Sequence, residues 1–349
     1  MGYNLKKIAE ESGCSISTVS RVINGKGRIS EATKEKVMKI AKEHDYVPNQ
    51  IARSLKNSKT NTIGIIVPDI RDYFYMFIKA ADAIFSEAGY SILLADSDEN
   101  AEKEEKYINL MYEKRVDGLV LATVSDRQEA LGRYFRNSVP VIFIDNLPHV
   151  DPAYEDCVLL DNGRASAMAV ECFIKEGHEK IAIIAGNERE TTGMERILGY
   201  KRSMEEHGLE VRPGLVKMGH FQEAGGYRCM KELLENREKE PFTAVYVSSY
   251  KMTCGALRAI RESGLKIPED VALIGFDFID NTGLITPSIT TIVQPIENIG
   301  DVVAKRLLAR VKTAEKSEQG EQIRDIAQKI ILAPEILEGE SSRRTASGQ

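Results

Sequence analysis

From Thr62 onward, short apolar runs alternate with longer amphipathic stretches, and this alternation limits the possible folds more than any other feature of the chain. The first run, residues 63–67, reads Ile-Gly-Ile-Ile-Val. Continuous apolar runs separated by helix-length segments are typical of parallel strands covered on both faces. We therefore predict an α/β body, with further strands at residues 91–95, 118–122, 141–145, 181–185, 244–247 and 271–277.

The length of this region determines how many sheets it forms. The whole chain has 349 residues, more than a single hydrophobic core normally holds. The part after residue 62 is long enough for two doubly wound lobes, each with a parallel sheet between helices. Ligands of such folds bind at the carboxyl ends of the strands, so the binding site is expected there.

Charge is distributed unevenly along the chain. Residues 1–60 hold 12 Lys and Arg against 6 Asp and Glu, a net charge of +6. The remainder holds 35 basic and 47 acidic residues, a net charge of −12. A basic head on an acidic body indicates that only the head approaches nucleic-acid phosphates.

The head shows the spacing of three short helices. Asn4, Ser15 and Ser30 each precede apolar residues at helical spacing, and all three belong to the types that cap helix N-termini. Gly13 ends the first helix, and Gly25, after Asn24, ends the second. The first two helices, joined by about three residues, form a helix-turn-helix unit.

The second helix has a small polar outer face. In a DNA-binding protein, such a helix enters the major groove. A three-helix packing module with a solvated polar face would show the same spacing, and spacing alone does not separate the two interpretations. The residues of this face are Ser17, Thr18, Ser20 and Arg21.

The individual residues of this segment distinguish the DNA-binding interpretation from the packing module. The run IAEESGCSISTVSRVING at residues 8–25 resembles the signature of the lac repressor (LacI/GalR) family almost position by position. The resemblance continues through YVPN at 46–49 and ARSL at 52–55 and covers the chain to about residue 340. It implies a transcriptional regulator, most simply a repressor, whose operator affinity is controlled by a small metabolite.

The resemblance also implies roles for residues of the head. Ile16, Ser17 and Arg21 would lie in the major groove, where Arg21 could read a guanine edge. Residues 49–56 would form a hinge helix, which is too short to be stable without DNA. The remaining DNA-contacting positions would be Thr18, Ser20, Asn24, Thr33, Asn49, Ala52 and Leu55.

Leu55 has two interpretations. It is either a core leucine packed against the body or, as the family implies, a wedge inserted into the minor groove, and the hinge context favours the wedge. The domain boundaries that follow are a helix-turn-helix domain at 1–47, a hinge helix and linker at 48–61, an effector-binding and dimerisation domain at 62–340, and a disordered tail at 341–349.

For the body, the resemblance implies a periplasmic-binding-protein fold in which the chain crosses between two lobes three times. We expect these crossings at residues 160–162, at 291–293 and after Glu318. The first lobe would then comprise residues 62–160 and 293–320, and the second lobe residues 161–292 and 321–340.

The predicted effector site lies just beyond the strand ends, at positions that match family ligand positions. Phe221 could instead be a surface aromatic, and Asp145 and Asp277 could cap helices or bridge the lobes. Aromatic faces with buried carboxylates and an arginine suit a sugar or a base. The full set is Tyr73, Phe74, Asp145, Thr192, Arg196, Phe221, Ser249, Asp277 and Gln294.

Two departures from the family prevent the ligand identity from being transferred. Residues 248–251 read Ser-Ser-Tyr-Lys where many relatives have an Asn-Asp pair, and Glu190 stands where purine-sensing relatives have a basic residue. Acidic Glu190 would repel an anion, so a neutral sugar is favoured over an anionic one.

Other function classes receive little support. The five His and five Cys residues are scattered, without metal or catalytic-triad spacing, so no enzyme, metal or cofactor is expected. No apolar run is long enough to span a membrane, and a cytoplasmic protein is expected. The alternative, a transport-associated sugar-binding protein, would lack the basic head. A homodimer is expected, because two heads read a pseudo-palindromic operator.

Overall fold

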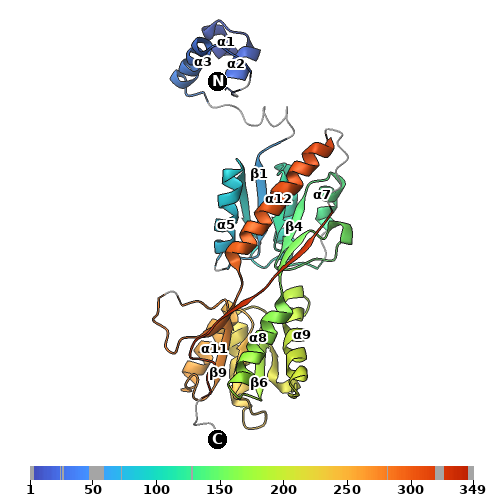
Figure 1. Ribbon diagram of the computed structural model, residues 1–349, viewed down its shortest axis with the longest axis vertical. Helices are drawn as coiled ribbons and strands as arrows, with labels where there is room; N and C mark the ends of the chain where they lie inside the picture. Colours follow the sequence, from blue (N-terminus) through green and yellow to red (C-terminus); the bar gives the residue numbers. More distant parts are fainter. Residues whose placement is uncertain are drawn as a thin grey trace. The chain divides into compact units, whose positions relative to one another are not determined.

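The chain divides into two compact units, Met1–Thr60 and Asn61–Gln349 (Figure 1). The computed structural model describes residues 4–23, 25, 27–46, 59–71, 73–126, 129–280, 282–318 and 326–344. We call the first unit the head and the second the body, and describe each by itself.

The head contains three helices, α1 (Leu5–Ser12), α2 (Ile16–Ile23) and α3 (Glu31–Glu43). The predicted caps are present, because Asn4 Oδ1 accepts from the backbone N–H of Lys7 at 3.1 Å and Ser30 Oγ from that of Thr33 at 3.3 Å. One apolar residue from each helix is fully buried in the shared core, namely Ile8, Val19 and Val37.

The body contains two six-stranded sheets. The first has the strand order β11-β5-β4-β3-β1-β2, with every neighbouring pair parallel. Its strands are β1 (Thr62–Val67), β2 (Ser91–Asp96), β3 (Gly118–Leu121), β4 (Val141–Ile144), β5 (Cys157–Leu160) and β11 (Lys329–Leu332).

The second sheet has the order β12-β10-β9-β8-β6-β7 and is parallel except for the edge strand β12, which runs antiparallel to β10. Its strands are β6 (Ile181–Ala185), β7 (Val216–Met218), β8 (Ala244–Val247), β9 (Ala272–Phe276), β10 (Thr290–Val293) and β12 (Glu335–Leu337). The predicted fold class, a helical head and a body of two doubly wound lobes, is confirmed.

Helices cover both faces of each sheet. In the first lobe these are α5 (Tyr73–Glu87), α6 (Ala101–Glu113), α7 (Gly132–Arg136) and α12 (Ile296–Glu318). In the second lobe they are α8 (Asn162–Lys175), α9 (Thr191–Glu206), α10 (Glu223–Glu235) and α11 (Tyr250–Glu262). Short 3-10 turns occupy Glu129–Leu131, Pro152–Tyr154 and Pro213–Leu215.

Each lobe has two clusters of buried residues, and each cluster gathers strand residues with those of particular helices. In the first lobe, one cluster includes Phe77 of α5 and Leu307 of α12, and the other includes Tyr134 of α7. In the second lobe, one includes Tyr200 of α9 and the other Met230 of α10. Burial on both faces explains why the central strands are apolar throughout.

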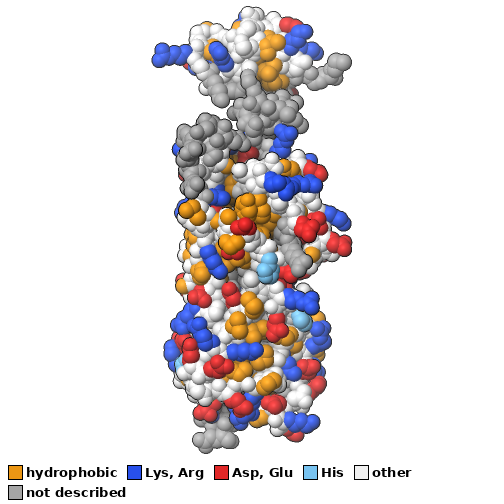
Figure 2. Space-filling model, turned by 90° about the vertical axis from the view of Figure 1, so that its right-hand side faces the viewer, with side chains coloured by type: hydrophobic (Ala, Val, Ile, Leu, Met, Phe, Trp, Pro, Cys, Tyr) orange, Lys and Arg blue, Asp and Glu red, His pale blue; other side chains and the backbone are white. Residues whose placement is uncertain are grey.

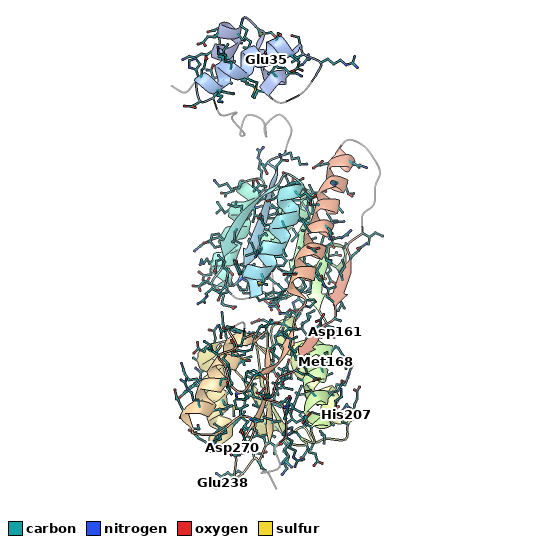
Figure 3. The ribbon with its side chains drawn as sticks, turned by 60° about the vertical axis from the view of Figure 1, so that its left-hand side comes forward. Glu35, Asp161, Met168, His207, Glu238 and Asp270 are labelled. Atoms are coloured by element: carbon teal, nitrogen blue, oxygen red, sulfur yellow. The ribbon has the colours of Figure 1, made fainter. Side chains whose placement is uncertain are left out.

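The chain passes between the lobes at three places. It crosses first between β5 and α8, near Asp161, whose carboxylate caps α8 by accepting from the N–H of Arg164 at 2.8 Å (Figure 3). It crosses again after β10. This strand pairs with β12 of the second sheet as far as Val293, so the second lobe extends one residue beyond the predicted boundary at residue 292.

The third crossing differs from the prediction, which placed residues 321–340 in the second lobe. β11 pairs with β5 of the first sheet, and only β12 joins the second sheet, so the chain crosses at residues 333–334. Both strands are short edge strands with partly exposed side chains. Their sequences therefore carry no information about which sheet they join.

The predicted disordered tail is also wrong for its first residues. Ser341 is fully buried, and its hydroxyl donates to the carbonyl of Leu273 at 2.6 Å while accepting from the N–H of Thr290 at 2.8 Å. Buried backbone groups at the starts of β9 and β10 need hydrogen-bond partners, and this polar residue supplies them. Residues 345–349 lie outside the described residues.

Candidate functional site

The outer side of α2 carries the residues that are predicted to contact DNA bases. Ile16 is 49% exposed, and Ser17 and Arg21 are also exposed, whereas Val19 faces the core. Ser15 fixes the first turn, since its hydroxyl accepts from the N–H of Thr18 at 3.1 Å. Predicted DNA-contacting residues that are partly exposed are Thr18, Ser20 and Thr33.

Four predicted DNA-contacting residues cannot be placed. Asn24, Asn49, Ala52 and Leu55 lie outside the described residues. Their assignment, including the wedge interpretation of Leu55, stays a prediction.

Arg21→Ala is expected to lower operator affinity by about 1–3 kcal/mol, or about 10- to 100-fold, and to relax the preference at one base pair. The reason is that a guanidinium can bind a guanine edge through two hydrogen bonds. Fluorescence anisotropy with an operator and its single-base variants measures both effects.

Lys39→Ala is the control, because Lys39 is an exposed cation on α3. Its loss should weaken binding equally for all sequences. If Arg21→Ala also weakens binding without changing base preference, Arg21 contacts phosphate only.

In the body, all nine predicted effector-site residues line one cavity of about 400 Å³. The first lobe contributes residues after the carboxyl ends of β1, β2 and β4, and the second lobe residues after β6, β8 and β9. This is where doubly wound folds bind ligands. Lining residues that the prediction did not include are Pro68, Asp69, Arg71, Met76, Glu99, Val124, Asn146, Glu190, Tyr250, Lys251, Phe276, Ile279 and Ile296.

Arg196, on α9, is held in place by its surroundings. Its side chain is 4% exposed; Nε donates to Asn162 Oδ1 at 2.8 Å and Nη1 to the carbonyl of Ser248 at 2.6 Å. The guanidinium carbon lies 3.7 Å from the centre of the Phe276 ring, a cation–π contact. A positive charge is therefore fixed in the cavity wall by the protein itself.

Asp145 and Asp277 occupy equivalent places in the two lobes. Asp145 directly follows β4 and Asp277 directly follows β9, and both have left-handed backbones, with φ of 62° and 52°. Aspartate adopts this conformation more readily than most residues other than glycine. Each lobe thus brings one carboxylate into the cavity wall.

The two carboxylates differ in their partners. Asp277 accepts hydrogen bonds from the backbone N–H of Gln294 at 3.0 Å and from its Nε2 at 2.7 Å. The Asp145 carboxylate has no hydrogen-bond partner among the described residues. Burial raises the pKa of both carboxyl groups, that of Asp277 to about 6, and the Arg196 guanidinium opposes this rise.

The pKa of Asp277 predicts that ligand affinity falls at low pH. Below about 6 this carboxyl is protonated, and a ligand donor must then displace the proton, so affinity should drop up to about tenfold per pH unit. Calorimetry at several pH values between 5 and 7.5 measures the effect. Asp277→Asn should flatten the profile, and an equally steep profile in that variant would assign it to another group.

The aromatic side chains come from both lobes. Tyr73 and Phe74, at the start of α5, form an edge-to-face pair with ring centres 4.8 Å apart. Phe221 packs over Gly186 so closely that a Cβ on that glycine would lie 2.0 Å from the ring. Glycine after β6 is therefore what leaves room for the Phe221 ring beside the cavity.

Asn146 links the lobes beside the cavity. It follows Asp145 in the first lobe, and its Oδ1 accepts from the backbone N–H of Thr192 at 3.1 Å and from the Thr192 hydroxyl at 2.8 Å, both in the second lobe. Its Nδ2 donates to Glu190 at 3.4 Å. Thr192, predicted as a ligand residue, thus also joins the lobes.

Lys251 and Asp69 form a second link, an ion pair of 2.7 Å between α11 and the loop after β1. Asp69 also binds Arg71 at 2.7 Å, and these hydrogen bonds hold the pKa of the Asp69 carboxyl well below its usual range. The position of Asp69, two residues after the end of a predicted strand, was a sequence signal for this site. The pairing with Lys251 had no such signal, because the two residues are far apart in the chain.

Lys251→Met is expected to loosen the contact between the lobes with little loss of stability, since a partly exposed ion pair contributes about 0.2–1 kcal/mol. Amide hydrogen exchange at residues 69–71 and in the first turn of α11 should become faster. Lys305→Met, which removes an exposed ion pair within α12, is the control. Unchanged exchange at both segments would show that the ion pair does not hold the lobes together.

A basic helix-turn-helix head and a two-lobed body around a polar and aromatic cavity define a class of protein: DNA-binding regulators that respond to a small molecule. Among the described residues there is no group of three or more His, Cys, Asp or Glu suited to a metal ion. None of the described helices is long and apolar enough to cross a membrane.

Comparisons with known proteins agree with this class. Residues 4–49 match the family model "Bacterial regulatory proteins, lacI family", and residues 170–342 match "Periplasmic binding protein-like domain". The HTH-type transcriptional regulator DegA of Bacillus subtilis is 33% identical over 97% of this chain and 97% of its own. Catabolite control protein A of Priestia megaterium is 32% identical over 90% of this chain and 94% of its own.

Solved structures are similar as well. A complex of the transcriptional regulator CelR with cellobiose is 28% identical, with a TM-score of 0.72, covering 97% of this chain and 99% of that one. The lac repressor dimer bound to operator has a TM-score of 0.81 at 24% identity, over 98% of this chain and 100% of that one, and shows the shared fold.

The chain belongs to the LacI family of bacterial regulatory proteins. It is a sequence-specific DNA-binding transcriptional repressor whose operator affinity is controlled by a small metabolite. The alternative function, a binding protein of a transport system, does not account for the matched DNA-binding head.

Proposed function

We propose that this repressor acts in the cytoplasm as a homodimer and that a sugar occupies the cavity and controls operator binding. The observation that carries the sugar assignment is the pair of carboxylates, Asp145 and Asp277, placed one in each lobe beside aromatic rings. Carboxylate oxygens accept hydroxyl donors from several directions, and aromatic rings cover the apolar face of a sugar ring. The relative CelR was solved with cellobiose, which supports the same ligand class.

Exposed apolar side chains support the homodimer. Figure 2 shows hydrophobic side chains on the surface of both lobes, between scattered charged ones. In the first lobe Tyr75 is 57% exposed, and in the second lobe Leu284 is 83% exposed. Water contact with such side chains is unfavourable, and a second copy would remove it. Other exposed apolar residues near these two in the sequence are Ile70, Met76, Ile279 and Ile285.

The test is operator binding by the full chain, measured on DNA from upstream of its own gene. Affinity should fall steeply between about 50 and 200 mM salt, because phosphate contacts release counterions. A sugar that stabilises the body should change operator affinity. Asp277→Ala should lose about 1–3 kcal/mol of sugar binding while retaining operator binding.

Two outcomes would contradict the proposal. Salt-independent DNA binding would mean that the head does not contact phosphates. If no compound that stabilises the body changes operator affinity, the cavity does not control DNA binding. Sedimentation equilibrium of wild type and Leu284→Asp tests the dimer, which should weaken in the variant.

A further inference from the structure

The cavity has more negative than positive groups in its wall. Its basic residues are Arg71, Arg196 and Lys251. Arg71 and Lys251 both pair with the same carboxylate, that of Asp69. The other acidic residues are Glu99, Asp145, Glu190 and Asp277. The charge of Arg196 acts on Asp145, Glu190 and Asp277, whereas that of Lys251 acts on Glu99.

None of these four carboxylates forms an ion pair with another described residue. Glu190 and Asp277 accept hydrogen bonds from neutral amides of Asn187 and Gln294. Asp145 and Glu99 accept no side-chain hydrogen bond from the part of the chain that the structure describes. The wall holds five acidic and three basic residues, so its net charge is −2 when all of them are ionised.

Such a surplus is costly without a ligand. Burial raises the pKa of all four carboxyl groups, that of Glu99 to about 7 and that of Asp277 to about 6, so their ionised forms are poorly stabilised by the protein and are favoured only when a positive charge is supplied. A neutral hydroxyl would donate a hydrogen bond but would leave the charge in place. A cationic group would supply both the hydrogen bond and the missing charge.

The rest of the wall suits a cation equally well. The rings of Tyr73, Phe74 and Phe221 line the same cavity. Aromatic faces attract cations, and they also pack against the carbon framework that carries an amino group. No described side chain or backbone N–H bonds to the carboxylate of Asp145 or of Glu99. Of these two, Asp145 lies beside the aromatic rings, since after burial its charge is the next cause of the raised pKa of the Tyr73 hydroxyl.

We propose that the effector carries a positively charged amino group in addition to hydroxyl groups, and that Asp145 is its main counter-ion. This inference rests on the proposed function of the cavity and narrows the ligand from sugars in general to amino sugars and similar cyclic amines. It also predicts that N-acetylation of the amine, which removes its charge, weakens binding.

The experiment uses the full chain and compounds that differ only in the amino group. The probes are glucosamine, galactosamine and mannosamine, each compared with its parent sugar and its N-acetyl derivative at millimolar concentration. Thermal unfolding is followed first, and calorimetry then measures affinity. We expect the amines to raise Tm more than their parents and the best amine to bind at least about tenfold tighter than its parent.

Two variants test whether Asp145 causes the preference for amines. Asp145→Asn preserves the size of the side chain, and asparagine also tolerates the left-handed backbone at this position. The variant should therefore fold but lose the preference for amines. Glu87→Gln removes an exposed carboxylate of α5 that does not line the cavity, and it should keep the preference.

The inference is overturned if no amine stabilises the protein, if parent sugars bind as tightly as amines, or if the preference survives Asp145→Asn. Its failure is distinguishable from failure of the proposed function. If neutral sugars bind and Asp277→Ala weakens that binding, the cavity is still the effector site and only the amine assignment is wrong.

Discussion

Arg196→Met is expected to destabilise the body, and to do so more at pH 7 than at pH 5. The substitution removes the bonds to Asn162 and to the Ser248 carbonyl, and each hydrogen bond of a charged group contributes about 1.5–3 kcal/mol. Methionine preserves the apolar contact with Phe276. The loss of stability therefore reports the removed charge and its hydrogen bonds, not a change in side-chain volume.

The pH dependence follows from the two aspartates. Arg196 lowers the pKa of Asp145 and Asp277, and without it both rise further above their unfolded values. A folded pKa that is raised above the unfolded value reduces stability as pH increases through the folded pKa. The variant should therefore be least stable, relative to wild type, above about pH 6, where Asp277 ionises.

Urea unfolding at the two pH values measures this difference. Arg202→Met is a matched control on the same helix, because Arg202 is 76% exposed and forms a surface ion pair with Glu206 at 3.3 Å. It should change stability by less than about 1 kcal/mol at either pH. If Arg196→Met lowers the free energy of unfolding equally at pH 5 and pH 7, the guanidinium does not stabilise the ionised forms of Asp145 and Asp277.

Asp156→Ala is expected to cost about 3–5 kcal/mol of stability, because it removes the buried carboxylate that two arginine side chains share. Asp156 is 1% exposed and lies just before β5. Arg306 of α12 binds it through Nε and Nη2, both at 3.0 Å, and Arg310 binds it at 3.1 Å. The same carboxylate accepts from the N–H of Gln328 at 3.4 Å.

This cluster joins three segments of the first lobe, so its loss should act locally as well as globally. Hydrogen exchange should become faster in β11 and in the C-terminal half of α12, while β6 and β8 of the second lobe stay protected. Asp301→Asn, which weakens an exposed pair with Lys305 on the same helix, should change stability by less than about 1 kcal/mol. If both variants unfold at the same urea concentration, the Asp156 cluster is not a stabilising element.

The sequence alone determined the head and the central strands. Asn4 and Ser30 cap helices because capping depends on residues within one turn, and Gly13 ends α1 because only local backbone freedom is needed. β1, β4, β6, β8 and β9 were predictable because strands buried on both faces must be apolar throughout. That the nine predicted residues line one cavity was predictable from the family resemblance and the rule that ligands bind beyond strand ends.

Only the tertiary structure decided which distant residues meet. β11 and β12 are edge strands with weak apolar patterns, so their choice of sheet depends on the neighbours available after the lobes have formed. Lys251 pairs with Asp69, and Ser341 with Leu273, across long stretches of chain. The surplus of carboxylates in the cavity has the same origin, because residue types and spacing do not encode the distances at which charges from two lobes face one another.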